Sequence, residues 1–219
     1  MRHLLLLFCI GWSVMTQAQS SGHLYLSAIP HPLTWDNTPL RYTLDPDRLV
    51  LTAGPETDMF RDPNVTYNTD NAPKLMFTAD THFVLSVRIR HAFTSKWDGG
   101  GVVLWQDSLN WVKFCFEKDY TGAHRVVTVV TRDVSDDCNS IAVKSDRVYY
   151  KIAKADHVIT LYCSEDNRNW LLVRHLQFEA DAPWQVGFLA QSPTGKQCEV
   201  VFSEISYRPV KIRDPYLGE

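Results

Sequence analysis

Short segments of alternating apolar and polar side chains constrain the fold of this chain more than any other feature. From Phe83 to Arg90, every odd position is apolar, whereas the even positions include Ser86, Arg88 and Arg90. In a β-strand, successive side chains point to opposite faces, so a period of two separates a buried face from an exposed one. A helix would mix the two classes. The segment therefore predicts a half-buried strand.

Similar segments recur along the chain and are separated by turn-forming Gly, Asn, Asp and Ser residues. Residues 98–101 and 107–110 are predicted turns, and residues 143–155 are the one stretch that competes as a helix, although their Val, Tyr and Ile content favours a strand. The other strands are expected at residues 48–53, 102–106, 111–117, 125–131, 149–153, 158–163, 170–175, 186–190 and 199–207. This number of short strands predicts an all-β fold, a two-sheet antiparallel β-sandwich.

The N-terminal segment has the pattern of a secretory signal. A basic start (Arg2, His3) precedes an apolar run over residues 4–15 and the small-residue sequence of residues 16–18. The run is shorter than the roughly 20 residues of a membrane-spanning helix, so we predict a signal peptide at residues 1–18 and no membrane insertion after cleavage. The remaining residues, 19–219, suit a single sandwich domain. We expect a secreted or periplasmic protein.

The charge balance bears on possible partners. The chain has 22 Lys and Arg against 25 Asp and Glu, a formal net charge of -3. A protein that binds nucleic acid through its overall charge would be basic, so no nucleic-acid partner is expected. The oligomeric state is left open by the sequence.

The sequence gives little indication of metal or thiol chemistry. The predicted mature chain contains four cysteines, Cys115, Cys138, Cys163 and Cys198. They allow three pairings, and either one or two structural disulfides or buried free thiols would be ordinary in an oxidising compartment. Their spacing does not fit a zinc knuckle, the histidines form no HExxH motif, and Asp133, Asp136 and Asp137 lack the order of a calcium loop. No metal and no cofactor are expected.

Three spaced motifs carry a family resemblance. They are KWDGGGV at residues 96–102, WVKFCFE at residues 111–117 and SEDNRNW at residues 164–170. With Val186-Gly187-Phe188 and a Thr57-Asp58 pair followed by Phe60, they resemble domain-of-unknown-function family 1349, the regulation-of-enolase-like family within the concanavalin A-like lectin/glucanase superfamily. The resemblance covers roughly residues 35 to 208.

The resemblance implies a concanavalin A-like jelly roll, a fold whose members often hold sugars on the concave sheet, and it supplies no established activity. Three departures from the family pattern are visible. Trp97 stands where the family often has Tyr, Gly99-Gly100 replaces a Gln-Ala pair, and Asn167 replaces a hairpin Gly. Asn tolerates the left-handed backbone conformation, so the hairpin is retained.

One strand face is the main candidate for ligand binding. Trp111, Lys113 and Glu117 share one side of a predicted strand. An aromatic plate beside hydrogen-bonding charges is suited to a sugar ring. Arg88, Arg90 and Trp105 are further candidates if their strands adjoin the same face. A carbohydrate-binding or accessory protein for an oligosaccharide or polysaccharide is therefore the first hypothesis; in the plainer alternative, Lys113 and Glu117 form a surface salt bridge and Trp111 only covers the sheet.

Glu117 also supports an enzymatic alternative. A glycoside hydrolase needs a pair of carboxylates, and Asp119 or Asp98 is the candidate helper, with Asp107 a further acid that could fold into range. The glucanase pattern E-x-D-x-x-E is incomplete here, because the second Glu is missing. A non-catalytic protein-interaction module is the third hypothesis.

Overall fold

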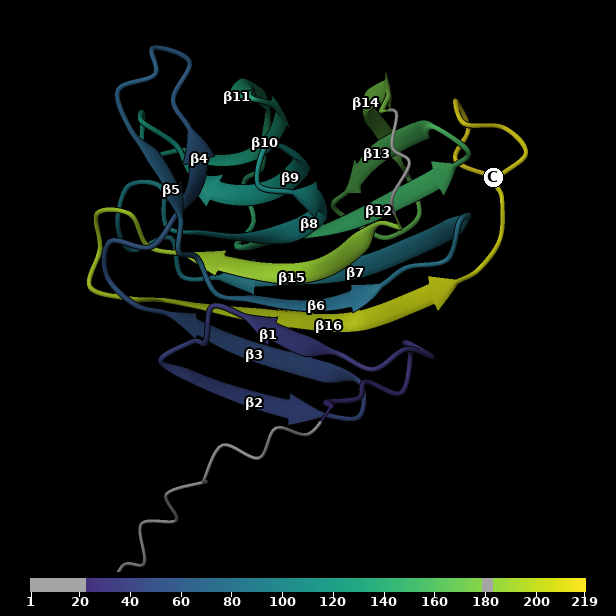
Figure 1. Cartoon of the computed structure of the whole chain (residues 1–219), viewed down its shortest axis with the longest axis horizontal. Helices are drawn as coiled ribbons and strands as arrows, with labels where there is room; N and C mark the ends of the chain where they lie inside the picture. Colours follow the sequence, from purple (N-terminus) through teal and green to yellow (C-terminus); the bar gives the residue numbers. More distant parts are fainter. Residues whose placement is uncertain (1–22, 179–182) are drawn as a thin grey trace, which may run out of the picture.

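The computed structural model describes residues 23–178 and 183–219, and in these residues it contains strands and loops but no helix (Figure 1). The predicted signal peptide at residues 1–18 lies outside the described residues. In the part of the chain that is described, no helix is long and apolar enough to cross a membrane.

Two seven-stranded sheets pack face to face, and we call them the first and the second sheet. The first sheet has the order β1 (Thr34–Asp36), β6 (Lys74–Thr78), β15 (Gln185–Gln191), β8 (Gly99–Asp107), β9 (Asn110–Lys118), β10 (His124–Arg132) and β11 (Val134–Ala142). The second has the order β14 (Leu171–Gln177), β13 (Val158–Ser164), β12 (Arg147–Ala155), β7 (Phe83–His91), β16 (Cys198–Arg208), β3 (Arg48–Ala53) and β2 (Arg41–Asp45). The pairings are antiparallel, which confirms the predicted two-sheet β-sandwich.

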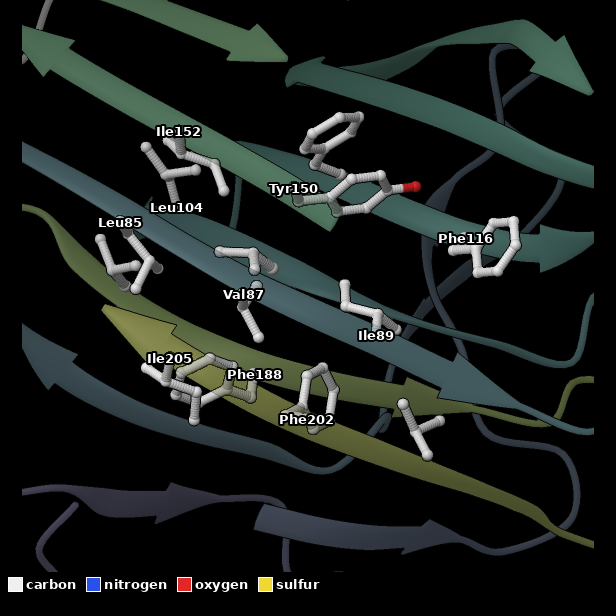
Figure 2. Close-up of a cluster of buried hydrophobic side chains, with 14 of the residues drawn as sticks. Leu85, Val87, Ile89, Leu104, Phe116, Tyr150, Ile152, Phe188, Phe202 and Ile205 are labelled. Carbon is white, nitrogen blue, oxygen red and sulfur yellow. The ribbon is translucent and has the colours of Figure 1, made fainter. Parts of the chain in front are cut away.

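The inner faces of the sheets form the main core, to which the apolar positions of each alternating strand contribute (Figure 2). Phe114 of β9 stacks on Tyr150 of β12, with ring centroids 3.6 Å apart. The Tyr150 hydroxyl donates a 2.7 Å hydrogen bond to the carbonyl of Cys115. A buried phenol needs such a partner, so this contact joins the two sheets without leaving an unpaired polar group.

A separate two-stranded hairpin, β4 (Met59–Arg61) and β5 (Asn68–Asp70), lies over the outer face of the first sheet (Figure 1). Its apolar contacts with that face create a second hydrophobic cluster, which includes Met59, Val103, Trp111 and Cys115. The backbone N–H of Arg61 also donates to the Ser135 hydroxyl on β11, at 3.0 Å. The first sheet is therefore buried on both faces beneath this hairpin.

The strand predictions were wrong or incomplete in several places. Residues 99–101 are not a turn but the start of β8, and the polar stretch that follows Asp133 is strand β11, which was not predicted. No strand was predicted between residues 54 and 82, where β4, β5 and β6 lie. Glycine runs and polar edge strands lack the alternation on which the predictions rest. The competing helix in residues 143–155 is excluded, because β12 occupies Arg147–Ala155.

The four described cysteines are all free. Cys115, Cys163 and Cys198 are buried, and Cys138 is exposed on β11. Of the two alternatives in the sequence, the structure has buried thiols rather than disulfides at three of these positions. Burial raises the pKa of the Cys163 thiol to about 11, which keeps it protonated and unreactive.

Candidate functional site

A cavity of about 350 Å³ lies beside the β4–β5 hairpin on the outer face of the first sheet. Its lining combines charged groups from β9 and β11 with aromatic side chains from the hairpin and from the loop before β8. A concave site with apolar walls and a few convergent polar groups is the usual form of a small-ligand site. We call it the hairpin pocket.

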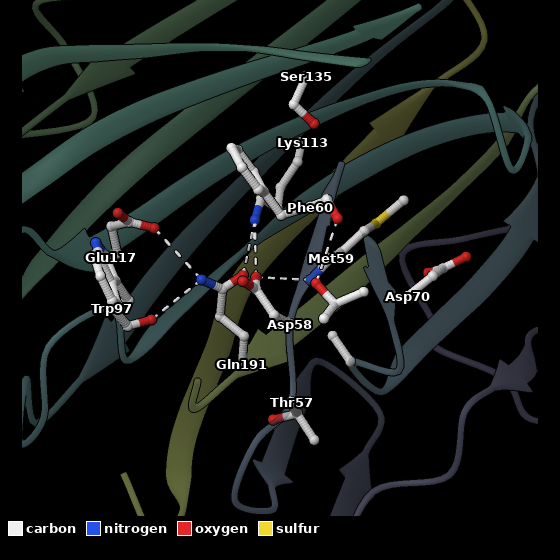
Figure 3. Close-up of polar contacts among 12 residues, drawn as sticks. Thr57, Asp58, Met59, Phe60, Asp70, Trp97, Lys113, Glu117, Ser135 and Gln191 are labelled. Atoms are coloured by element: carbon white, nitrogen blue, oxygen red, sulfur yellow. Dashed lines mark hydrogen bonds and ion pairs between the residues drawn. The ribbon is translucent and has the colours of Figure 1, made fainter. Parts of the chain in front are cut away.

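The floor of the hairpin pocket is a hydrogen-bonded polar cluster (Figure 3). The Lys113 ammonium donates to the Gln191 side-chain carbonyl at 3.0 Å and lies 3.4 Å from the Asp58 carboxylate. The Gln191 amide nitrogen donates to the Trp97 carbonyl at 3.1 Å and contacts the Glu117 carboxyl at 3.5 Å. Gln191 therefore connects Lys113, Glu117 and the loop that carries Trp97.

Gly99 explains how side chains from non-adjacent strands meet here. In register, it lies between Gln191 on β15 and Glu117 on β9. A Cβ atom at Gly99 would lie 2.9 Å from both the Cys115 sulfur and the Glu117 Cβ. The absence of a side chain on β8 lets Gln191 reach across that strand. The glycine run serves close approach in a strand, not a turn.

Burial shifts the pKa values of the charged side chains around the floor of the hairpin pocket. Glu117 is 8% exposed, and burial raises its pKa to about 8, an effect that Lys113 opposes and that Asp137 and Asp58 reinforce. Burial also raises the pKa of Asp137. Burial, the largest single effect, disfavours the charged form of Lys113, but Asp58 and the other acidic groups around it together outweigh burial and raise its pKa above the usual value. At neutral pH the floor therefore offers a cation, a carboxylate acceptor and a carboxylic acid that can donate.

Aromatic side chains form the rim of the pocket. Tyr67 is 52% exposed and Trp97 is 37% exposed, and Phe60 lies with its ring centroid 6.0 Å from that of Tyr67. Trp97 has φ of 64°, a left-handed conformation that is unfavourable for a bulky residue. The Trp97 backbone N–H donates to the Lys118 carbonyl at 2.7 Å, and the Gln191 side-chain amide donates to the Trp97 backbone carbonyl. The floor thus holds this strained tryptophan at the rim.

The structure corrects the role expected for Trp111. Only 1% of this residue is exposed, because the β4–β5 hairpin covers it. It does not offer a ring face to a ligand. Trp105 is half-buried in the same cluster, and its buried indole N–H has no hydrogen-bond partner among the described residues. The aromatic side chains at the rim are instead Phe60, Tyr67 and Trp97.

Arg88 and Arg90 do not adjoin Lys113 and Glu117, so that part of the prediction was wrong. They lie on β7 in the second sheet, and their side chains are on its outer face, because the intervening Ile89 is fully buried in the core. The direct salt bridge of the plainer alternative is also not formed. Among the described residues Lys113 pairs with Asp58, and Gln191 lies between Lys113 and Glu117.

The proposed carboxylate partners of Glu117 hold loops instead. Asp119 accepts hydrogen bonds from Thr121 and Arg125, at 2.6 and 2.9 Å, and although burial opposes the shift, these bonds lower its pKa to about 2. Asp98 accepts from the Ser192 hydroxyl at 2.7 Å and from the Ser95 N–H at 2.8 Å. Asp107 closes the exposed β8–β9 turn by accepting from the Leu109 N–H.

Asp133, Asp136 and Asp137 also do not come together in the arrangement of a calcium site. The Asp133 carboxylate pairs with Arg61, Asp136 pairs with Arg174 at 2.8 Å, and Asp137 lines the hairpin pocket. No group of three His, Cys, Asp or Glu residues in the described ranges is placed to hold a metal ion.

Most residues that line the hairpin pocket were not among the predicted site residues. Asp58 and Trp97 stood in motifs quoted for the family resemblance, which was the available signal. Tyr67 and Gln191 carried none, since one lies in an irregular loop and the other at the end of a buried strand. The role of Gln191 depends on contacts with Lys113, 78 residues away in the chain, and with Trp97, 94 residues away.

Comparison with known proteins gives a consistent result. The family model for "Protein of unknown function (DUF1349)" matches residues 35–210. Regulation of enolase protein 1 of Saccharomyces cerevisiae is 25% identical over 174 residues, which cover 79% of this chain and 87% of that protein. A crystal structure of a functionally unknown protein from the same yeast aligns with a TM-score of 0.74 at 23% identity, over 80% of this chain and 95% of that one.

A larger protein shares the fold over part of its length. The GH43 BlXynB protein from Bacillus licheniformis aligns with a TM-score of 0.59 at 14% identity. The match covers 80% of this chain but only 39% of BlXynB. This likeness concerns the sandwich fold alone.

Proposed function

The chain belongs to the DUF1349 family of proteins of unknown function, and on that premise we propose that it is a secreted or periplasmic carbohydrate-binding protein that holds an oligosaccharide in the hairpin pocket. The expected location rests on the signal-like sequence of residues 1–18. The expected ligand rests on the chemistry of the pocket.

The observation that carries the proposal is the aromatic rim above a polar floor. Trp97 and Tyr67 present ring surface on which the C–H face of a sugar can stack. Lys113, Asp58 and the protonated Glu117 supply donors and acceptors for hydroxyl groups. A volume of about 350 Å³ accommodates one or two sugar rings.

The fold comparison supports the same class of ligand. One aligned structure is described as a GH43 glycoside hydrolase, with a TM-score of 0.62 at 15% identity. This chain spans only 38% of that protein, so the hydrolase activity is not transferred with the fold.

The test is calorimetric titration of the protein against a panel of plant, host and microbial oligosaccharides. Trp97→Ala should weaken binding about tenfold or more while thermal unfolding stays cooperative, because the ring is at the rim rather than in the core. Tyr120→Ala is the matched control, since Tyr120 is exposed and does not line the pocket. Equal affinity of Trp97→Ala and the unchanged protein would refute the assigned site.

The raised pKa of Glu117 favours glycoside hydrolysis as a second candidate function. A carboxylic acid protonated at neutral pH is what a general acid requires, and Asp58 or Asp137 would be the second carboxylate. Product analysis on polysaccharides decides between the candidates. Release of sugars that disappears in Glu117→Gln supports hydrolysis, and binding without product release supports the first proposal.

A further inference from the structure

Four arginines gather on the outer face of the second sheet, on the opposite side of the sandwich from the hairpin pocket. Arg48, Arg88, Arg90 and Arg147 line a hollow of about 360 Å³ with Val201 and Ser203. The arginines come from β3, β7 and β12, and the two smaller residues come from β16, which runs between β7 and β3. We call this hollow the arginine basin.

The register of the strands brings the arginines together. Ser203 pairs with Arg88 on one side and with Arg48 on the other. One step along, Arg90 pairs with Arg147 on one side and with Val201 on the other. Small side chains on β16 therefore form the bottom of the basin, and guanidinium groups form its walls.

The carboxylates near the basin do not fill it. Arg88 pairs with Glu204 at 2.7 Å and Arg90 with Asp146 at 3.7 Å, and neither acid lines the hollow. Among the described residues, Arg48 and Arg147 have no carboxylate within ion-pair distance; Asp45 is opposite Arg48 in register but forms no ion pair with it. The basin itself is lined by cations without an anion.

Without a bound anion, this arrangement of arginines lowers the stability of the folded protein. Arg90 and Arg147 are directly opposite each other on neighbouring strands, where like charges destabilise a sheet. Guanidinium groups bind sulfate, phosphate or carboxylate oxygens in paired hydrogen bonds, so an oxyanion would relieve the repulsion.

We propose that the arginine basin is a second binding site, for sulfate groups carried on an anionic polysaccharide. A sulfated chain fits better than a nucleic acid, because the protein is acidic overall, with a pI of about 6.2, and the aromatic residues that would stack on bases do not line the basin. The site is independent of the hairpin pocket, since the two lie on different sheets.

The experiment titrates the protein with a heparin-derived oligosaccharide, its desulfated counterpart, sodium sulfate and a short DNA duplex. Only the sulfated oligosaccharide is expected to bind tightly, and added salt should weaken it. The double variant Arg90→Gln, Arg147→Gln should lose about tenfold or more in affinity and reduce the slope of log affinity against log salt by about two.

Two controls make the result specific. Arg168→Gln, Arg213→Gln changes the net charge equally at exposed positions outside the basin and should retain binding. The thermal midpoint of the basin variant should equal or exceed that of the unchanged protein, because a like-charge pair is removed. Trp97→Ala, which disables the hairpin pocket, should still bind the sulfated oligosaccharide.

The remaining outcomes overturn the proposal. It fails if the basin variant keeps its affinity, if the control variant loses as much, if DNA binds as tightly as the sulfated sugar, or if nothing binds. Loss of binding in Trp97→Ala but not in the basin variant would place the sulfated ligand in the hairpin pocket instead. Tight binding of sodium sulfate alone would show a free-anion site and overturn the assignment to a polysaccharide.

Discussion

The two large sheets each turn one face away from the shared core, and these outer faces hold charge in different surroundings. On the first sheet, the β4–β5 hairpin covers Lys113 and Glu117, which are 2% and 8% exposed. On the second sheet, the basin arginines stand open to solvent or are only partly covered. The same strand alternation produced both polar faces.

The difference shows that a polar strand face acquires its chemistry from what covers it. Under the hairpin, burial raises the pKa of Glu117 to about 8 and forces Lys113 to find partners. On the other sheet, water screens the charges of the arginines. Three substitution pairs test this comparison.

The largest effect is expected for Trp111→Ala. It leaves a cavity beneath the hairpin and should lower the free energy of unfolding by about 3–5 kcal/mol. Tyr149→Ala is the control, because Tyr149 is half-buried on the outer face of the second sheet with no hairpin above it, and its loss should be much smaller. Urea denaturation measures both. Equal losses would mean that the hairpin does not bury Trp111 in solution.

A smaller effect is expected for Lys113→Met. Asp58 and Gln191 lose their cation in a buried cluster, and the free energy of unfolding should fall by about 2–3 kcal/mol, reduced from a fully buried pair because Asp58 is partly exposed. Arg88→Met breaks the more exposed pair with Glu204 and should cost under about 1 kcal/mol. If the two variants are equally stable by urea denaturation, the outer faces do not differ as described.

The smallest effect concerns pH. Between the unfolded pKa of Glu117 near 4.5 and its folded pKa of about 8, the folded state binds one more proton than the unfolded state. The stability contribution of this proton is complete below the lower value and is lost as pH rises. From pH 6 to 8, the unchanged protein should lose about 2 kcal/mol relative to Glu117→Gln.

Thermal unfolding of both proteins at several pH values measures this difference. Asp119→Asn is the control, because its folded pKa of about 2 and unfolded value of 3.8 place its effect in acid. Its stability contribution is present above pH 3.8 and lost below, so the difference from the unchanged protein should be constant from pH 6 to 8. Parallel curves for Glu117→Gln and the unchanged protein would show that Glu117 is ionised in the folded state.

Much of the architecture was predictable because it is encoded locally. The alternation from Phe83 to Arg90 and from Trp111 to Glu117 identified strands and their two faces, and the strand count identified the sandwich. The prediction that Lys113 and Glu117 lie on the same face of β9 also agrees with the structure. Strands without alternation, such as β8 at its glycines and polar β11, were missed for the same reason.

The candidate site was only partly predictable. Alternation shows that Arg88 and Lys113 lie on polar faces, but it does not say on which sheet, so the two were wrongly grouped. It also cannot show that a hairpin over 40 residues earlier in the chain covers Trp111, or that Gln191 reaches Glu117 across Gly99.

The sequence by itself therefore determined the alternating strands, the polarity of their faces and the sandwich, because the alternation depends on neighbours two residues apart. Only the tertiary structure decided which faces meet, which aromatic residues remain exposed and which carboxylates are buried. Those properties depend on contacts between distant segments, and burial by such contacts is what changes the pKa of Glu117 and gives the hairpin pocket its chemistry.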